Sequence, residues 1–577
     1  MAKAKFDTHA EQEAFHHSSA HVLAQAVLRV FPKAKLTIGP TIEGGFYYDI
    51  DVRPLKPEDI KQIEAQMKKI VKEDHKIKRH EVAKKKALQM FKDNPYKIEL
   101  IEELPKNEKI TYYEQGEFKD LCRGPHIRST GEIQAFKLTK VSSAYWRGDS
   151  KNKSLQRIYG VSFPTREELN KYLELQREAE KRDHRKIGKQ LGWFSFHEEG
   201  AGFPFWHGKG TIIYDEVLYY MKDLIRSEGY QEIKTPIILN KSLWLMSGHW
   251  DNYKENMYFT EIDGQEYAVK PMNCPGGLLI YKSDIHSYRE LPLKIGEFGL
   301  VHRHEMSGVL AGLFRVRCFT QDDAHVFCTE DQLKEEVQKL IKTITKVYKT
   351  FGFREYQIEL STRPEKSIGS DKMWSHAEKI LNKALKELKI KFKLNPGDGA
   401  FYGPKIDFHI KDCMGRSWQC GTIQADFSMP KKFKLTYEGK DGKKHSPVMI
   451  HRAIFGSLER FIGIMIEHFA GKLPLWLSPV QVRVLTVSDK FSKYGEKVVK
   501  QMTNAGVRAE LDCRTESIGK KVREAQIEKV NYILVVGEKE KKEKTVFVRT
   551  FHNKMLGAKK TDSFIKTLVK EISDKKI

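Results

Sequence analysis

The sequence predicts a multidomain α+β protein, and three observations support this fold class. The chain has 577 residues, which is enough for about three to four domains. Hydrophobic residues make up 40% and charged residues 31%, as in globular proteins that bury several cores. Helical and strand-like patterns are mixed through most of the chain, whereas they alternate regularly after Pro479.

Residues 1–162 are predicted to form an N-terminal α/β domain. Residues 11–30 are predicted as a helix, because apolar side chains recur there at three- and four-residue steps. Residues 59–91 are predicted as one basic helix. Gly44 and Gly45 indicate a turn into the strand that follows them.

Residues 163–192 are predicted as a charged linker helix. Thr165 with Glu168 three residues later is typical of a capping box at a helix start. The helix is expected to continue through residues 182–185 and to have little apolar face. The largest domain is predicted to follow it, over residues 193–475.

Residues 478–577 are predicted to form a small α/β domain, after a short linker bracketed by Pro474 and Pro479. Strand-like runs alternate there with helical segments, which favours a mainly parallel sheet. These runs are residues 482–487, 508–513, 532–537 and 545–550.

The charge balance is strongly basic. Lys and Arg number 101 against 77 Asp and Glu, giving a net charge of +24. Such an excess indicates a polyanionic partner, because cationic side chains displace counterions from phosphates. The alternative is a solvated, lysine-rich surface with no such partner.

Cysteine usage and hydropathy indicate a cytoplasmic protein. The chain has 7 cysteines, an odd number spread over a long sequence, which favours reduced thiols over a disulfide framework. We find no run of 18 apolar residues, so no membrane span is expected. The polar segment Met1 to Gln12 lacks the apolar core of a signal peptide.

A pattern of arginines and a glutamate marks residues 298–328, which are predicted as two strands around a glycine-containing loop. Arg303 and Glu305 are two apart, as are Arg315 and Arg317, so each pair is expected to share one face of a strand. Arginine suits phosphate, because its planar group donates two bonds at once. A surface ladder of charge pairs is the alternative explanation.

This segment resembles motif 2 of class II aminoacyl-tRNA synthetases, in Arg303-His304-Glu305 and Phe314-Arg315. Pro236 resembles the proline of motif 1, and GSLERF, which contains Arg460, resembles motif 3. The resemblance implies a central domain with an antiparallel sheet flanked by helices, and a homodimer with Pro236 at its interface. It also implies binding of ATP with Mg²⁺ and in-line attack of an amino-acid carboxylate on the α-phosphorus. Arg303 would hold the α-phosphate, Glu305 and Arg315 the adenine end, and Arg460 the γ-phosphate.

Cys274, His325 and His451 are possible metal ligands. Taken singly, each is explained as well by a buried thiol or a core histidine, and their spacing alone indicates no metal site. Their local sequences, MNCPG, TQDDAH and MIHRA, closely resemble those of the zinc ligands in threonyl-tRNA synthetases. The resemblance implies one catalytic Zn²⁺ with three protein ligands and an open fourth position.

The implied substrate is L-threonine, whose amino and hydroxyl groups an open zinc can bind. Valine lacks the hydroxyl, and sites built for a hydroxyl reject its absence by roughly 10⁴–10⁵-fold. Serine lacks only a methyl group, worth about 1–3 kcal/mol, so a second, hydrolytic site is expected. The pocket residues that the resemblance implies are Gln321, Asp323, Tyr402, Lys405, Gln419, Thr422 and Gln424.

Two histidine and cysteine pairs suggest that second site. His17 and His21 are four apart on the predicted helix and share a face, and Cys122 and His126 flank a Gly-Pro that favours a loop. The four could hold a structural zinc or bind water for hydrolysis. They resemble the editing domain shared by threonyl- and alanyl-tRNA synthetases, which implies deacylation of seryl-tRNA(Thr). That resemblance adds two further pocket residues, Lys97 and Asp120.

The last domain resembles the anticodon-binding domain of the same enzymes, so tRNA(Thr) is the implied partner. Glu540 and Arg549 match positions that contact anticodon bases, whereas Thr515 replaces an asparagine found in some relatives. Many relatives begin with a ubiquitin-like domain, and this sequence starts at the editing domain. Two alternatives are a non-catalytic RNA-binding regulator and a free-standing editing hydrolase. The intact arginines and zinc triad argue against the first, and the long central block argues against the second.

Overall fold

A computed structural model describes residues 8–42, 44–105 and 108–577. The chain divides into two compact units, Met1–Glu178 and Ala179–Ile577, and each is described by itself. The prediction that the chain has no signal peptide rests on the segment from Met1 to Gln12, and most of that segment lies outside the described residues. Over the described part of the chain, helices long and apolar enough to cross a membrane do not occur.

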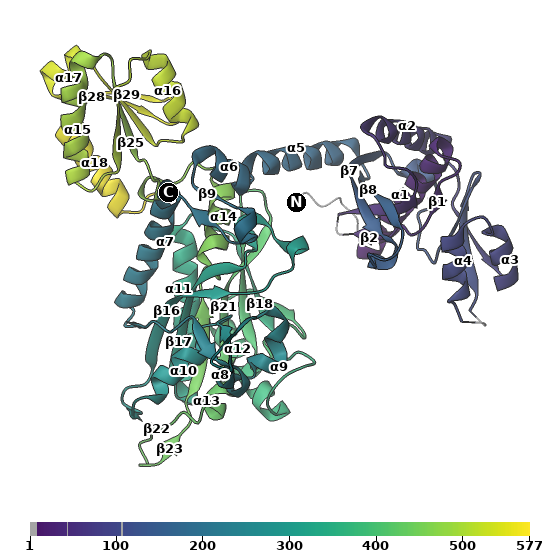
Figure 1. Ribbon diagram of the computed structural model, residues 1–577, viewed down its shortest axis with the longest axis horizontal. Helices are drawn as coiled ribbons and strands as arrows, with labels where there is room; N and C mark the ends of the chain where they lie inside the picture. Colours follow the sequence, from purple (N-terminus) through teal and green to yellow (C-terminus); the bar gives the residue numbers. More distant parts are fainter. Residues whose placement is uncertain (1–7, 43, 106–107) are drawn as a thin grey trace. The chain divides into compact units, whose positions relative to one another are not determined.

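The N-terminal unit contains a five-stranded antiparallel sheet in the order β1-β3-β8-β7, with β2 paired to β3 (Figure 1). Helix α1 packs against α2 and β3, and a smaller sheet, β4-β5-β6, adjoins α3 and α4 in the sequence. The helices are α1 (His9–Val30), α2 (Pro57–Glu73), α3 (Lys84–Met90) and α4 (Pro95–Glu102). The strands are β1 (Lys35–Leu36), β2 (Thr41–Ile42), β3 (Gly45–Asp51), β4 (Lys78–Val82), β5 (Ile110–Gln115), β6 (Phe118–Leu121), β7 (Ala135–Tyr145) and β8 (Ser154–Phe163).

Two predictions for this unit have opposite outcomes. The helix predicted over 11–30 is confirmed as α1, which a capping box between Thr8 and Glu11 starts slightly earlier. The single helix predicted over 59–91 is wrong. Helix α2 ends at Asp74, whose φ of 51° is left-handed, and β4 then pairs with β5, so a long-range sheet pairing overrides the local helical pattern.

Helix α5 (Arg166–Arg182) is the predicted linker helix. The amide of Glu168 donates to Thr165 Oγ1 over 3.3 Å, and the amide of Thr165 donates to the Glu168 carboxylate, which completes the predicted capping box. Leu169 is its one buried residue, so the expectation of little apolar face is confirmed. The helix does not continue through 182–185, because Asp183 caps a separate helix, α6 (His184–Leu191).

The central body is built on an eight-stranded sheet in the order β11-β16-β17-β24-β21-β20-β18-β19. Its inner pairs are antiparallel, as predicted, and only the edge strands β11 and β19 pair in parallel. Helices α11 and α14 pack on its central strands over a large apolar core. The strands are β11 (Gln231–Glu232), β16 (Leu293–His302), β17 (Cys318–Cys328), β18 (Tyr356–Ser361), β19 (Lys393–Asn395), β20 (Lys405–Lys411), β21 (Ser417–Asp426) and β24 (Val448–Ala453).

The remaining elements of this body surround the sheet. Its helices are α7 (Gly208–Ser227), α8 (Lys241–Ser247), α9 (His249–Tyr253), α10 (Cys274–Lys282), α11 (Glu330–Thr350), α12 (Asp371–Glu387), α13 (Met429–Lys432) and α14 (Leu458–His468). Small sheets are formed by β9 (Phe194–Ser195) with β10 (Phe205–Trp206), by β12 (Ile238–Asn240), β13 (Tyr258–Ile262) and β14 (Gln265–Val269), and by β15 (His286–Ser287), β22 (Tyr437–Glu438) and β23 (Lys444–His445).

The C-terminal body is a five-stranded sheet in the order β26-β25-β27-β28-β29, with helices on both faces (Figure 1). The predicted α/β type is confirmed, but the sheet is not mainly parallel. Strands β26, β25 and β27 are parallel, whereas β27, β28 and β29 are antiparallel. The elements are β25 (Val482–Thr486), α15 (Ser492–Asn504), β26 (Ala509–Asp512), α16 (Ile518–Ile527), β27 (Tyr532–Val536), α17 (Glu538–Glu543), β28 (Thr545–Thr550), β29 (Met555–Lys560) and α18 (Thr561–Ser573).

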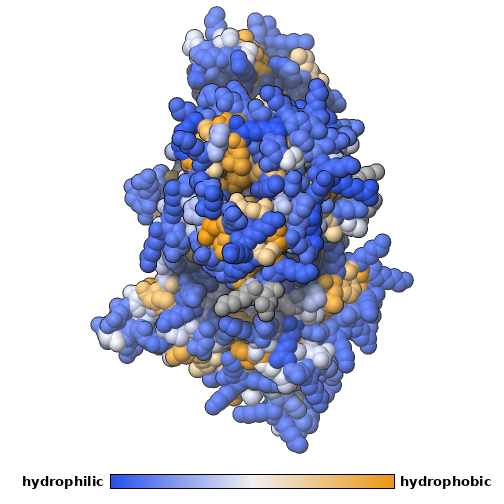
Figure 2. All heavy atoms as spheres, turned by 90° about the vertical axis from the view of Figure 1, so that its right-hand side faces the viewer, coloured by the Kyte–Doolittle hydropathy of each residue, from blue (hydrophilic) through white to orange (hydrophobic). Residues whose placement is uncertain are grey.

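The surface is rich in charged side chains. The face drawn in Figure 2 is mostly hydrophilic, with separate small hydrophobic groups. This distribution follows from a composition in which 31% of residues are charged, and it agrees with both explanations offered for the basic net charge.

Candidate active sites

Cys274, His325 and His451 meet inside the central body. Cys274 begins α10, and the two histidines face each other across β17 and β24. One ligand atom from each residue lies within 4.8 Å of the others, and all three residues are buried. The folded chain therefore brings together three possible metal ligands that are far apart in the sequence.

A buried histidine nitrogen in this cluster has no protein partner within the described part of the chain. Burial raises the pKa of the Cys274 thiol and lowers the pKa of His325. His325 Nε2 is buried and has no hydrogen-bond partner among the described residues, whereas His451 Nε2 lies 3.1 Å from Asp426 Oδ2. A buried nitrogen without a partner is unfavourable, and a metal ion would satisfy it. One thiolate and two imidazoles suit a borderline-soft metal.

Two of the predicted pocket residues share a strand with His325. Gln321, Asp323 and His325 alternate along β17, so they face the same side of the sheet. Burial raises the pKa of Asp323 to about 6, and the amide of Asn273 lies 3.4 Å from its carboxylate. The ring of Tyr402 lies 4.8 Å from that of His451, which places a further predicted residue beside the cluster.

Asp407 on β20 organises a second group of predicted residues. Its carboxylate accepts hydrogen bonds from Gln419 Nε2 over 2.8 Å and from Thr422 Oγ1 over 3.0 Å. Lys405 Nζ lies 2.9 Å from the other carboxylate oxygen. Tyr402 donates to Gln424 in the same region. Asp407 is not among the predicted residues, although its alternation with Lys405 along the strand places both on one face.

The motif 2 residues do not lie on strands, which corrects the strand prediction. Strand β16 ends at His302 and β17 begins at Cys318. The connection between them therefore holds Arg303, Glu305, Arg315 and Arg317. Alternate residues face the same side only within a strand. This connection instead contains two 3-10 turns, so the spacing of two does not fix where these side chains point. Arg315 Nε pairs with Glu305 at 3.4 Å, and Arg317 Nε donates to the Glu305 carbonyl over 2.9 Å.

Arg303 and Arg460 donate to main-chain carbonyls and lie against aromatic rings. Arg303 Nε donates to the Pro271 carbonyl over 3.2 Å, and its guanidinium lies 5.0 Å from the ring of Phe319. Arg460 on α14 donates to the Phe314 carbonyl over 3.1 Å. Carbonyls neutralise none of their positive charge, so both groups remain available to an anionic ligand.

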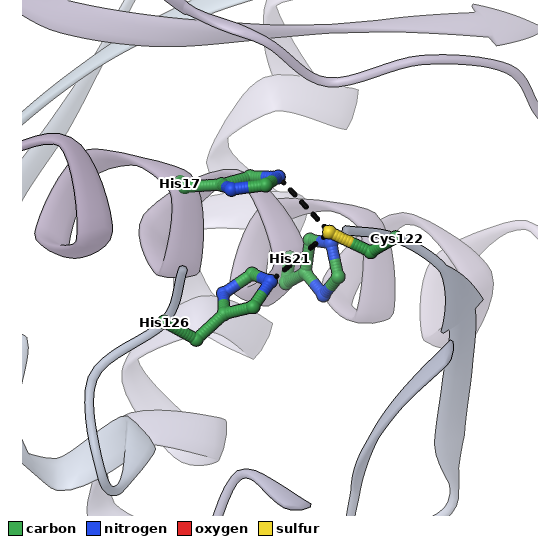
Figure 3. A group of neighbouring side chains, drawn as sticks. All are labelled: His17, His21, Cys122 and His126. Carbon is green, nitrogen blue, oxygen red and sulfur yellow. Dashed lines mark hydrogen bonds between the residues drawn. The ribbon is translucent and has the colours of Figure 1, made fainter. Parts of the chain in front are cut away.

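The four predicted ligands of the N-terminal unit also meet (Figure 3). His17 and His21 project from α1, and Cys122 and His126 lie beyond β6. Cys122 Sγ lies 3.3 Å from His17 Nε2 and 3.2 Å from His126 Nε2. The loop predicted between the second pair is confirmed, since Gly124 has a φ of 78° and its amide donates to Cys122 Sγ.

Burial controls the protonation of this cluster. It raises the pKa of Cys122 to about 11 and lowers the pKa values of all three histidines. Without a ligand, the thiol is therefore protonated and the imidazoles are neutral near pH 7. His21 Nδ1 is buried with no hydrogen-bond partner among the described residues, so the pocket offers it to a ligand.

Lys97 and Asp120 lie in the same pocket, as predicted, and form an ion pair with 2.6 Å between Nζ and Oδ1. Tyr48, which is not among the predicted residues, donates to the other oxygen of Asp120. Both members of the ion pair are buried. The pocket has a volume of about 740 Å³ and is also lined by His17, His21 and Cys122.

The two predicted anticodon residues lie in the C-terminal body. Glu540, in the first turn of α17, accepts a hydrogen bond from the Gly537 amide over 3.0 Å. Arg549 on β28 donates to the side chain of Asn553. Thr515 lies in the connection between β26 and α16.

Three family models match the chain. They are described as the tRNA synthetase class II core domain (G, H, P, S and T) over residues 258–469, the anticodon binding domain over 481–571, and the threonyl and alanyl tRNA synthetase second additional domain over 110–159. A threonine–tRNA ligase of Carboxydothermus hydrogenoformans is 57% identical over 99% of this chain and 90% of its own length. One from Clostridioides difficile is 56% identical with the same coverage. A solved structure, the RNA binding domain of a Cryptosporidium parvum threonyl-tRNA synthetase, has a TM-score of 0.66 and 41% identity, over 67% of this chain and 98% of that one.

Proposed function

The chain belongs to the threonine–tRNA ligase family, and on this premise we propose that it activates threonine with ATP and transfers it to tRNA(Thr). The observation that carries the proposal is the buried cluster of Cys274, His325 and His451. It lies beside residues that can hold an amino acid, and Arg303 and Arg315 lie in the connection that leads into β17, the strand of His325. None of the comparisons favours the non-catalytic regulator.

We propose that the cluster holds Zn²⁺, which when bound supplies a Lewis-acidic open position for the amino and hydroxyl groups of threonine. The orphaned Nε2 of His325 supports this assignment. Asp323, on the same face of β17, would orient the substrate ammonium. Valine would leave the open position unsatisfied, and serine would satisfy it, so selectivity at this site excludes the first and admits the second.

Arg303, Arg315 and Arg460 are proposed to bind the phosphates and adenine of ATP, which enters with Mg²⁺. The threonine carboxylate attacks the α-phosphorus in line, the bond to the β-phosphate oxygen breaks, and pyrophosphate leaves. The arginines act by holding the phosphates in position and by stabilising the charge that develops on the oxygens. Lys405, ordered by Asp407, would face the same reacting groups.

The pocket of the N-terminal unit is proposed to hydrolyse seryl-tRNA(Thr). A neutral histidine can position or deprotonate the attacking water, and burial keeps the pKa values of His17 and His21 low. The Lys97–Asp120 pair would fix the seryl group. The extra methyl group of threonine would be rejected by the fit of this pocket.

The remaining proposals concern partners and boundaries. We propose a homodimer, with the segment at Pro236 in its interface, and light scattering that reports only the 67.0 kDa chain at micromolar concentration would contradict it. Glu540 and Arg549 are proposed to contact anticodon bases. The domain limits proposed are 1–162, 163–192, 193–475 and 478–577.

ATP–pyrophosphate exchange with each of the twenty amino acids tests the main proposal. Threonine should drive the exchange, and serine should be the only substantial competitor, because it alone retains the hydroxyl on a side chain of similar size. Exchange driven best by proline, histidine or glycine would overturn the proposal.

A further inference from the structure

The junction between α5 and α6 contacts the loop that carries Arg315. His184, the first residue of α6, is only 2% exposed. Its Nε2 accepts a hydrogen bond from the Leu313 amide over 2.9 Å, and its Nδ1 lies 2.7 Å from Glu467 Oε1. Because an amide can only donate, Nε2 is the unprotonated nitrogen, and Nδ1–H donates to Glu467.

These bonds account for a cluster that could be mistaken for a metal site. Asp183, His184 and Glu467 bring ligand atoms within 4.8 Å of one another. However, both ring nitrogens of His184 already have protein partners, and Asp183 accepts from the amide and guanidinium of Arg185. The arrangement is that of a hydrogen-bonded support for a loop.

Phe314, which follows Leu313 in the loop, contacts both His184 and Arg460. The ring of Phe314 lies 4.1 Å from the ring of His184. The carbonyl of Phe314 accepts the hydrogen bond from Arg460 Nη1, 3.1 Å away. A shift of the loop at Leu313 would therefore move the acceptor that fixes the Arg460 guanidinium.

A second path joins the same groups through Glu467. Its other carboxylate oxygen lies 2.6 Å from Arg416 Nη2, and Arg416 Nε donates to Asp412 over 2.6 Å. Asp412 accepts from Trp418 Nε1 over 2.9 Å, and the Trp418 ring lies 4.4 Å from that of Phe314. The contacts form a closed ring, which restrains the loop from two sides.

The backbone at Gly312 packs closely against His184. Gly312 has a φ of 54°, and a Cβ there would lie 2.3 Å from His184 Nε2. The loop thus approaches the imidazole as closely as a glycine permits. Such close packing transmits small displacements instead of absorbing them.

We infer that His184 is a positioning residue for ATP binding, acting through Leu313 and Phe314 on Arg315 and Arg460. The inference rests on the proposed ATP roles of those two arginines. It extends those roles, because His184 lies outside all three motifs and would nevertheless help to orient the nucleotide. Removing the acceptor at Nε2 would leave a buried amide unsatisfied, and the loop would move to find water.

The test is steady-state pyrophosphate exchange by the full-length, metal-loaded protein, with ATP and threonine varied in turn. His184→Phe keeps the ring and removes both hydrogen bonds. We expect its KM for ATP to rise about tenfold, while the KM for threonine and the zinc content stay within about twofold of wild type. His184→Gln offers an acceptor to the Leu313 amide and should recover most of the loss.

His468→Phe is the matched control, because His468 follows Glu467 and is bonded to the Cys413 amide, not to the loop. It should leave both KM values unchanged. If His184→Phe does not fold, Glu467→Gln, which removes the charged acceptor of Nδ1–H, takes its place with the same expectation of a selective rise in the KM for ATP.

Three results would overturn the inference: an unchanged KM for ATP in His184→Phe, an equal rise in both KM values, or no recovery in His184→Gln. Arg460→Leu separates this failure from failure of the proposed function. If that variant raises the KM for ATP and the His184 variants do not, only the positioning role is wrong. If Arg460→Leu has no effect on ATP, the proposed role of Arg460 is itself wrong.

Discussion

His325 and His451 form a cross-strand pair between β17 and β24, with ring centroids 5.0 Å apart and planes at 82°. The sheet fixes this geometry, because each residue is held by ladder hydrogen bonds on a central strand. Only Cys274 reaches the pair from a helix, at the first position of α10. The cluster therefore depends on a rigid sheet and one helix terminus.

Cys274→Ser should bind no zinc at the proposed site and should not activate threonine. A serine hydroxyl is a poor zinc ligand compared with a thiolate, and the exchange is small, so the fold should be largely retained. Metal analysis of the purified protein, circular dichroism and threonine-dependent exchange test this. Cys318→Ser, a half-buried cysteine outside the cluster, is the control. Equal zinc in both variants would refute the ligand assignment.

His21→Ala combined with Cys122→Ala should remove editing and spare synthesis. The variant should charge threonine at a near-normal rate and accumulate seryl-tRNA(Thr), which the wild type clears. Deacylation of preformed seryl-tRNA measures this directly, and His16→Ala is the control, because His16 is a buried α1 histidine bonded to Ser162. A folded variant that still hydrolyses seryl-tRNA at the wild-type rate would show that the assignment is wrong. Loss of protease resistance in the N-terminal unit would indicate a structural metal instead.

Asp407→Asn should reduce kcat/KM for activation by about tenfold to hundredfold. Asparagine preserves the volume of the side chain, but it removes the negative charge that holds Lys405 and replaces one carboxylate oxygen with an amide group. Gln419 and Thr422 both donate to the single oxygen Oδ1. Pyrophosphate exchange measures the effect. Ser361→Ala removes a donor to the same carboxylate and should have a much smaller one. Wild-type kinetics in Asp407→Asn would exclude an organising role.

Glu459→Gln should make the stability of the protein less dependent on pH between about pH 5 and pH 8. Burial raises the pKa of Glu459 to about 8, so the folded chain retains a proton that the unfolded chain loses from its usual pKa upward. Stability is therefore lost as pH rises from about 4.5 to about 8, by up to about 1.4 kcal/mol per pH unit. Glutamine can still accept from the Thr320 amide and does not titrate.

Thermal unfolding between about pH 5 and pH 8 tests this expectation. The difference in Tm between Glu459→Gln and wild type should grow in favour of the variant as pH rises. Glu290→Gln, at a half-exposed carboxylate, should follow the wild type. Parallel curves for all three proteins would mean that Glu459 does not hold its proton in the folded state.

Local patterns predicted the elements that depend on local interactions. Helix α1 and the capping box at Thr165 follow from nearby residues, and both were predicted correctly. The pairing of β4 with β5 depends on residues more than twenty-five positions away, so a local helical pattern was misleading there. Strand β29 was missed because its edge position leaves most of its side chains exposed or half-buried.

The candidate sites divide in the same way. Residues inside recognisable motifs, such as Cys274 and His21, were predicted through resemblance, and their roles stay predictions. Asp407, Tyr48 and His184 were not, because their importance lies in contacts with residues distant in the sequence. A buried carboxylate or histidine gives little sign in the sequence of which partner it will bind.

The separation of the three proposed metal ligands along the chain affects unfolding. Cys274, His325 and His451 come from segments separated by long stretches of chain, and the described cysteines form no disulfide. An ion bound by all three would act as a reversible cross-link that closes two large loops of the unfolded chain, and wide loops gain most from closure. Chelation should therefore lower the melting temperature of the central body through the entropy of the denatured ensemble, beyond the loss of the ligand bonds.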